Sequence, residues 1–147
     1  MAFESDLTLI AIAGRPDLWR FAAPLVWSDG DDSVVVPRGF ITDLASIPRA
    51  LDWAPDLDRT GLSRRPAALH DWLYGGDRSR GKDWADKTLR MALLAEGMSW
   101  IGAYEYWFAV HAFGAHAWAN DNRVLRAEHF YAQADFDEYM AGLVPEL

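Results

Sequence analysis

The spacing of the apolar residues changes near residue 45, and this change constrains the fold more than any other feature of the chain. Alternating apolar residues and turn signals predict short strands over 7–13, 18–27, 33–36 and 39–41, with the second strand broken near Pro24. Beyond residue 45, helical spacing predicts a short turn after 46–48 and helices near 66–74, 84–98, 100–119 and 123–142. We therefore expect an α+β fold, with a small N-terminal antiparallel sheet packed on a bundle of about four helices.

Length and composition favour one domain over residues 1–147. The chain has 147 residues, of which 51% are apolar, so it can bury a substantial core. We expect strands mainly in 1–44, helices in 45–122 and an acidic C-terminal helix in 123–147. No apolar run reaches the length of about 18 uncharged residues that a membrane span needs, so we predict no transmembrane segment. The N-terminal residues lack the basic and apolar regions of a signal peptide, which indicates a cytoplasmic protein.

Charge is distributed unevenly along the chain, whose net charge is -8. Residues 59–90 carry eight basic side chains against four aspartates, whereas the segments on both sides are acidic. Within this basic stretch, we predict that Arg65, Arg78 and Arg80 bind an anionic ligand such as a phosphate. The alternative is that these arginines pair with acidic residues of the same chain. The acidic surface as a whole argues against general nucleic-acid binding.

Residues 70–74 read His-Asp-Trp-Leu-Tyr and lie on a predicted helix. Pro66 suits the first turn of that helix, and the glycine pair that begins at Gly75 ends it. Because His70 and Tyr74 are four residues apart, their side chains lie on the same face of the helix. A histidine and a phenol on one face are candidate catalytic groups.

Asp86 is expected to meet His70 from the following helix. If Asp83 caps that helix and the two helices run antiparallel, His70 lies about 6 Å before the end of one and Asp86 about 4.5 Å beyond the cap of the other. Asp86 also precedes Leu93 by seven residues, on the apolar face of its helix. An unpaired carboxylate is costly there, so we expect His70 or Tyr74 as its partner.

Each of these residues also has a structural interpretation. Acidic residues such as Asp86 favour the first turn of any helix, because they interact with its dipole. His70 can be a core histidine bonded to a backbone carbonyl, and Asp71 can point to solvent. All of these residues lie in one short helical hairpin. A functional site explains this grouping better than several independent coincidences would.

Other sites are excluded or disfavoured by the sequence. The chain has no cysteine, so it has no disulfide, no thiolate nucleophile and no cysteine-based metal site. It also lacks the Gly-x-Ser-x-Gly motif of many serine hydrolases. His111 and His116 are five residues apart and do not share a helix face, so we predict no zinc site from them. The aromatic stripe on the predicted helix 100–119 is typical of a core or an interface; it consists of Tyr104, Trp107, Phe108, His111 and Trp118.

The motifs of the central region resemble an uncharacterised family of small tailed-phage and prophage proteins. Residues 36–49 read VPRGFITDLASIPR and match VP-x-GF-x-TD-x-ASIP, and residues 69–74 and 85–86 match the HD-x-LY and AD helices that follow in that family. An aromatic helix completes the resemblance, which covers roughly residues 5–120. The resemblance implies a phage or prophage origin, and a location in the cytoplasm of the host cell or in the virion. It implies no particular activity.

A second similarity, to phospholipases A2, concerns the HD-x-x-Y helix and a later helical aspartate. In those enzymes the histidine activates water, the adjoining aspartate binds calcium, and the later aspartate orients the histidine with help from the tyrosine. The similarity implies these roles for His70, Asp71, Asp86 and Tyr74, with Ca²⁺ or another divalent cation at Asp71. The chain departs from that pattern because it has no disulfides and no glycine-rich calcium loop shortly before His70, where only Gly61 is near.

Two further side chains are candidates for the same site. Asp43 and Ser46 of the TD-x-AS stretch can supply a carboxylate and a hydroxyl, although this stretch also suits a capped turn that locks the sheet to the helices. An HD phosphohydrolase is less well supported than a phospholipase-like enzyme, because no histidine precedes His70.

Together these observations predict metal-assisted hydrolysis of an ester or phosphodiester, with an anionic small molecule or a lipid as substrate. The alternative is a non-enzymatic phage protein. It would be a virion or tail component that contacts other virion proteins, or a host-interaction protein such as a counter-defence factor. Under that alternative, the polar residues of the hairpin form a buried network that fixes the helices.

Overall fold

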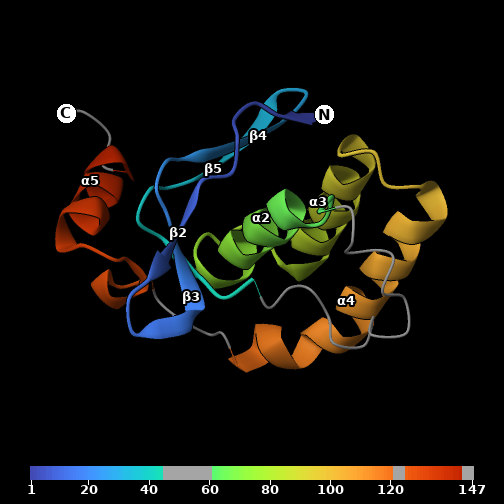
Figure 1. The fold of residues 1–147 in the computed structure, drawn as a ribbon. Helices are drawn as coiled ribbons and strands as arrows, with labels where there is room; N and C mark the ends of the chain where they lie inside the picture. The colour runs from blue at the N-terminus through green and yellow to red at the C-terminus, as the bar shows by residue number, and fades with distance from the viewer. Residues whose placement is uncertain (45–60, 121–124, 144–147) are drawn as a thin grey trace.

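The computed structural model describes residues 1–44, 61–120 and 125–143, with strands in the first part and helices in the rest (Figure 1). This arrangement confirms the predicted α+β class. The elements are β1 (Ala2–Phe3), β2 (Leu9–Ile12), β3 (Arg15–Phe21), β4 (Leu25–Asp29), β5 (Asp32–Val36), β6 (Ile41–Thr42), α2 (Arg64–Gly75), α3 (Lys82–Ala95), α4 (Trp100–Asn120), the 3-10 helix η2 (Ala127–His129) and α5 (Gln133–Leu143).

The described strands form two small sheets where one was expected. Each sheet has three antiparallel strands, in the orders β1-β4-β5 and β2-β3-β6. The predicted break near Pro24 is the point at which the chain leaves one sheet and enters the other. Proline suits such a point, because its nitrogen cannot donate a hydrogen bond to a neighbouring strand.

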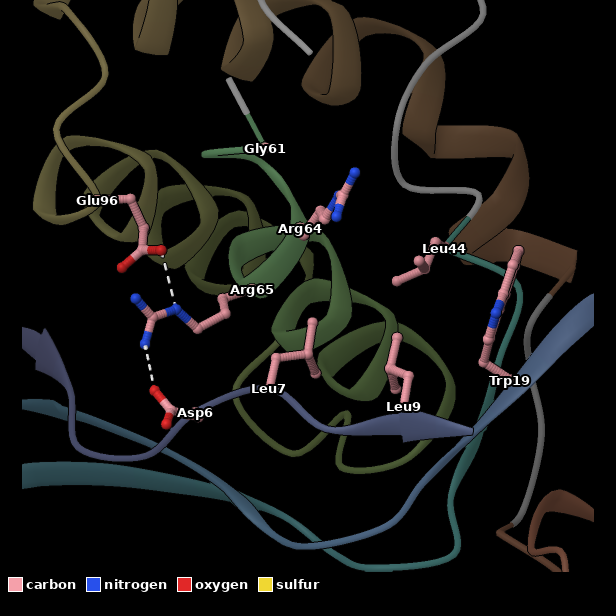
Figure 2. A pocket seen from close by; sticks show the side chains of 9 residues that line it. All are labelled: Asp6, Leu7, Leu9, Trp19, Leu44, Gly61, Arg64, Arg65 and Glu96. Carbon is pink, nitrogen blue, oxygen red and sulfur yellow. Dashed lines mark hydrogen bonds and ion pairs between the residues drawn. The ribbon is translucent and has the colours of Figure 1, made fainter. Parts of the chain in front are cut away.

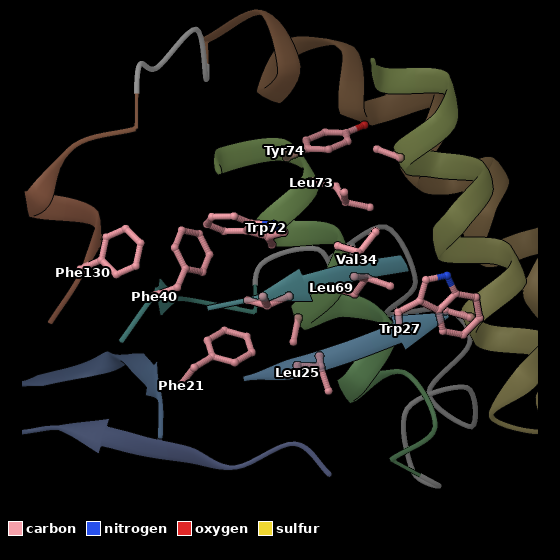
Figure 3. Packing of buried hydrophobic residues seen from close by; sticks show 14 residues of the cluster. Phe21, Leu25, Trp27, Val34, Phe40, Leu69, Trp72, Leu73, Tyr74 and Phe130 are labelled. Atoms are coloured by element: carbon pink, nitrogen blue, oxygen red, sulfur yellow. The ribbon is translucent and has the colours of Figure 1, made fainter. Parts of the chain in front are cut away.

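The main core lies between the strands and α2. Alternate residues of β4 and β5 are buried, as expected for strands with one face against a core: Leu25, Trp27, Val34 and Val36. These side chains belong to the same buried cluster as Leu69 and Trp72 of α2, part of which is drawn in Figure 3. Full burial of one such side chain contributes about 1.5–3 kcal/mol.

The helices of the hairpin begin and end close to their predicted bounds. The expectation that Asp83 caps the second helix is wrong, since Gly81 is the N-cap residue and Asp83 lies in the first turn.

A second cluster of buried residues joins α3 to α4 through Leu89, Leu93 and Tyr106. None of the helices in the described ranges is long and apolar enough to cross a membrane.

The C-terminal region folds differently from the single helix predicted over 123–142. The described residues there form η2 and α5, and between them Phe130 makes an antiparallel β-bridge with Phe40. The Tyr131 amide donates a hydrogen bond of 2.8 Å to the carbonyl of Gly39. This segment therefore docks against the first part of the chain. The turn predicted after 46–48 lies outside the described residues.

Candidate active site

The carboxylate of Asp86 accepts hydrogen bonds from side chains of three helices. His70 Nε2 (2.8 Å) and the Tyr74 hydroxyl (2.6 Å), both on α2, donate to Oδ1. Lys82 Nζ on α3 (2.6 Å) and His111 Nδ1 on α4 (3.1 Å) donate to Oδ2. The predicted meeting of His70, Tyr74 and Asp86 is therefore present, and two further cationic or basic groups join it.

Asp86 is ionised although its side chain is 0% exposed. Burial alone raises the pKa of this carboxyl, but hydrogen bonds from His70, Lys82 and Tyr74 outweigh burial and hold the pKa well below its ordinary value. An ionised carboxylate only accepts hydrogen bonds, so Nε2 of His70 carries a proton. In a neutral His70 the lone pair is therefore on Nδ1.

Tyr74 stays protonated in this environment. Burial, followed by its hydrogen bond to Asp86, raises the pKa of Tyr74 well above the ordinary tyrosine value. Its ring lies against the imidazole of His70, with 4.1 Å between the ring centroids, and meets Trp118 edge to face at 5.1 Å. Tyr74 thus fixes both the carboxylate and the imidazole in place.

Lys82 and His111 were not predicted as site residues. Lys82 precedes Asp86 by one helical turn, and this spacing of four residues is itself a sequence signal for the ion pair. Lys82 Nζ also donates to the backbone carbonyl of His111 at 3.1 Å, which links α3 to α4. His111 lies 25 residues beyond Asp86, and only the packing of α4 on α3 brings the two together.

The TD-x-AS stretch approaches α2 through a residue that was not predicted. The hydroxyl of Thr42 donates to the carboxylate of Asp71, and the amide of Leu44 donates to Thr42 Oγ1 at 3.0 Å. The predicted candidate Asp43 is exposed, and Ser46 lies outside the described residues. Thr42 therefore joins β6 to the helix that carries His70.

The structure does not bring Arg65 to the other two predicted anion-binding arginines. Arg65 lies in the first turn of α2 and donates to Glu96 at 2.9 Å, whereas Arg78 and Arg80 follow the end of that helix. Arg78 donates to the carbonyl of Trp118 at 2.8 Å and lies over its indole ring, and Arg80 pairs with Asp32 at 3.2 Å. Arg65 and Arg80 thus pair with acidic residues of their own chain, whereas Arg78 contacts a backbone carbonyl and an indole ring.

A hollow of about 690 Å³ lies at the other end of α2 (Figure 2). Figure 2 shows Arg65 between Asp6 and Glu96 on one side of it. Its described lining is Asp6, Leu7, Leu9, Trp19, Leu44, Gly61, Arg64, Arg65 and Glu96. None of the side chains that bond to Asp86 lines this hollow, so it is separate from the site around that carboxylate.

The described residues do not form a metal site around Asp71. Within 1–44, 61–120 and 125–143, no three His, Asp or Glu side chains are grouped so that they could hold a metal ion. Calcium needs about six oxygen ligands. These residues therefore do not fit a resident calcium ion, and Ca²⁺ or another divalent cation at Asp71 stays a prediction from the resemblance.

Comparison with known proteins places the chain in a family. A family model matches residues 19–110, which contain His70, Tyr74, Lys82 and Asp86 and end one residue before His111. No curated protein and no solved structure matches the chain. The matched segment covers more than half of the 147 residues. The chain therefore belongs to the family described as Protein of unknown function (DUF1353).

Proposed function

We propose that this protein hydrolyses an ester or a phosphodiester, with His70 as the general base. The observation that carries the proposal is the 2.8 Å hydrogen bond between His70 Nε2 and Asp86 Oδ1, which orients the imidazole and keeps the Nε2 proton directed at the carboxylate. Nδ1 takes a proton from water as the water oxygen bonds to the carbonyl carbon or the phosphorus, and Asp86 stabilises the imidazolium that forms. The imidazolium then returns this proton to the leaving alcohol as the bond to that alcohol breaks. Tyr74 is a positioning residue, because it donates to the same carboxylate oxygen.

The similarity to phospholipases A2 adds support. It implied that a later helical aspartate orients the histidine with help from the tyrosine, and the contacts of Asp86 with His70 and Tyr74 agree with that role. The substrate we propose is an anionic small molecule or a lipid. The imidazole of His70 is 2% exposed, so turnover requires that water and the reacting bond reach Nδ1. Because the described residues do not fit a metal ion, no step is assigned to one.

The test compares the wild-type protein with His70→Gln. Glutamine keeps a donor toward Asp86 and a similar volume, but it removes the base. We expect hydrolysis of p-nitrophenyl esters, bis-p-nitrophenyl phosphate or phosphatidylglycerol vesicles to fall about 10²- to 10⁴-fold, with the melting temperature almost unchanged. Each assay is run with CaCl₂, with MgCl₂ and with EDTA, which also tests the predicted cation.

His116→Gln is the matched control, because His116 is an exposed histidine on α4. We expect this control variant to keep wild-type turnover. Retention of full activity by His70→Gln would exclude His70 as the base. Absence of turnover in the wild-type protein on every substrate would exclude the hydrolase proposal for these substrate classes.

A second candidate function is structural, and the burial of Asp86 favours it. Donors from α2, α3 and α4 satisfy both oxygens of this carboxylate. A buried polar network that holds three helices together requires that each of its acceptors has such a donor. We place this function in a phage or prophage protein, either as a virion or tail component or as a host-interaction protein. Mass spectrometry of purified phage particles tests the virion component, which should be present in stoichiometric amounts.

A further inference from the structure

We propose that α4 is a dimer interface, which packs antiparallel on α4 of a second copy of this chain. The helix is apolar on two faces. One face packs on α3 through Ala103, Tyr106 and Val110, while the other exposes large apolar side chains to solvent. These are Trp100 (71% exposed), Ile101 (64%), Tyr104 (44%) and Phe108 (60%). Figure 1 shows α4 at the edge of the molecule, beyond α3.

The geometry of the exposed rings favours a protein partner over a sugar or a base. Trp100 and Tyr104 are stacked with centroids 5.8 Å apart, and Trp107 and His111 are stacked at 4.9 Å. Tyr104 and Trp107 also touch, at 5.5 Å, so the rings form a continuous ladder along the helix. At each stacked contact the two rings cover one face of each other, and Arg90 lies over the Trp107 ring. Ligands that stack need a free ring face, whereas exposed aromatic side chains also pack well against another protein surface.

The two halves of this face differ in the size of their side chains. Its first half carries the bulky side chains from Trp100 to Phe108, and its second half exposes Ala112, Ala115 and Ala119. In an antiparallel pair, the two-fold axis is perpendicular to both helices and passes near their midpoints. The bulky half of each copy then faces the alanine half of the other.

Charge and area also favour a second copy. The chain has a net charge of -8, yet Glu105 is the only Asp, Glu, Lys or Arg between Trp100 and Asn120. Two copies therefore repel each other less through this helix than through an acidic face. The four exposed side chains present on the order of 500 Å² per copy. Two copies would bury about 1,000 Å², which is the lower bound for a specific interface.

The first test measures the mass of the full chain by light scattering and sedimentation equilibrium, from micromolar to millimolar concentration. We expect twice the chain mass of 16.6 kDa. Ala115→Glu should produce monomers, because it buries a carboxylate between the helices. The alanine is exposed and glutamate is a good helix former, so folding is preserved. Ala141→Glu on α5 is the matched control, since that alanine is also exposed, and it should remain dimeric. A monomeric wild-type protein, or a dimeric Ala115→Glu variant, would overturn the proposal.

The second test fixes the orientation of the helices and uses the absence of cysteine from the chain. Ile101→Cys and Ala119→Cys lie at opposite ends of the exposed face. When the two variants are mixed and oxidised, we expect a disulfide between one variant and the other, and little within each variant alone. Cross-linking of Ile101→Cys to itself would exclude the antiparallel arrangement.

Discussion

Gly114 lies so close to Tyr74 that a Cβ atom on residue 114 would be 2.8 Å from the phenolic oxygen. The absence of a side chain therefore allows α4 to approach α2 at this point. The same approach brings His111, one turn earlier on α4, within hydrogen-bond distance of Asp86. Gly114 thus determines how the third helix closes on the buried carboxylate.

Gly114→Ala should destabilise the protein, because the added methyl group collides with the Tyr74 hydroxyl. We expect a loss of about 1–3 kcal/mol in the free energy of unfolding, measured by urea titration. The matched control is Gly142→Ala on α5, where a Cβ atom meets nothing within 4 Å. At that position the substitution should raise the free energy of unfolding by about 0.5–1 kcal/mol, since alanine is a better helix former than glycine. Equal effects of the two substitutions would contradict the close approach.

Asp86→Asn should be among the most destabilising single substitutions in this chain. It leaves Lys82 mostly buried without its ionised partner, and the expected loss is about 3–5 kcal/mol at neutral pH. Adding Lys82→Met to this variant should recover part of the lost stability, because the unpaired charge is removed. Asp83→Asn, at an exposed position of the same helix, should change the free energy of unfolding by less than about 0.5 kcal/mol.

Tyr74 should make the protein less stable in alkaline solution. The pKa of Tyr74 is raised in the folded state. The contribution of protonated Tyr74 to the free energy of unfolding is therefore complete below the unfolded pKa of about 10 and is lost as the pH rises above that value. Urea titrations between neutral and strongly alkaline pH should therefore show a shallower fall in stability for Tyr74→Phe. Some alkaline fall should remain, because burial also raises the pKa of Tyr139. An unchanged pH profile in Tyr74→Phe would contradict the burial of this phenol.

Gly39→Ala should detach α5 from the strands. Gly39 has a φ of +86°, and a Cβ atom there would lie 2.5 Å from Cβ of Asp135 on α5. We expect a loss of more than about 2 kcal/mol, together with faster proteolytic cleavage after residue 130. Gly30→Ala is the control, because Gly30 also has a positive φ but has open space around it. That variant should show the backbone strain alone, about 1 kcal/mol.

The part of the site that could be predicted from the sequence follows from local patterns. His70 and Tyr74 share a helix face because of their spacing, and the position of Asp86 on an apolar face demanded a partner. The observed hydrogen bonds agree with this reasoning. His111 and Thr42 could not be found in the same way, because their contacts depend on how α4 and β6 pack against the hairpin.

The fold shows the same division between local and distant interactions. Helical periodicity placed α2, α3 and α4 to within a few residues. The C-terminal region was predicted as one helix because its composition is helical, but pairing of Phe130 with Phe40 holds that part of it in an extended conformation. The strands were predicted as one sheet, since strand propensity alone does not tell which strands pair.

The bridge between Phe40 and Phe130 has a consequence for biosynthesis. The aromatic cluster around Phe40 stays uncovered on the ribosome until Phe130 has left the exit tunnel, about 90 residues later. Until then the nascent polypeptide exposes hydrophobic surface of the kind that chaperones recognise. Final closure of the aromatic cluster therefore waits for a segment that is synthesised about 90 residues after Phe40.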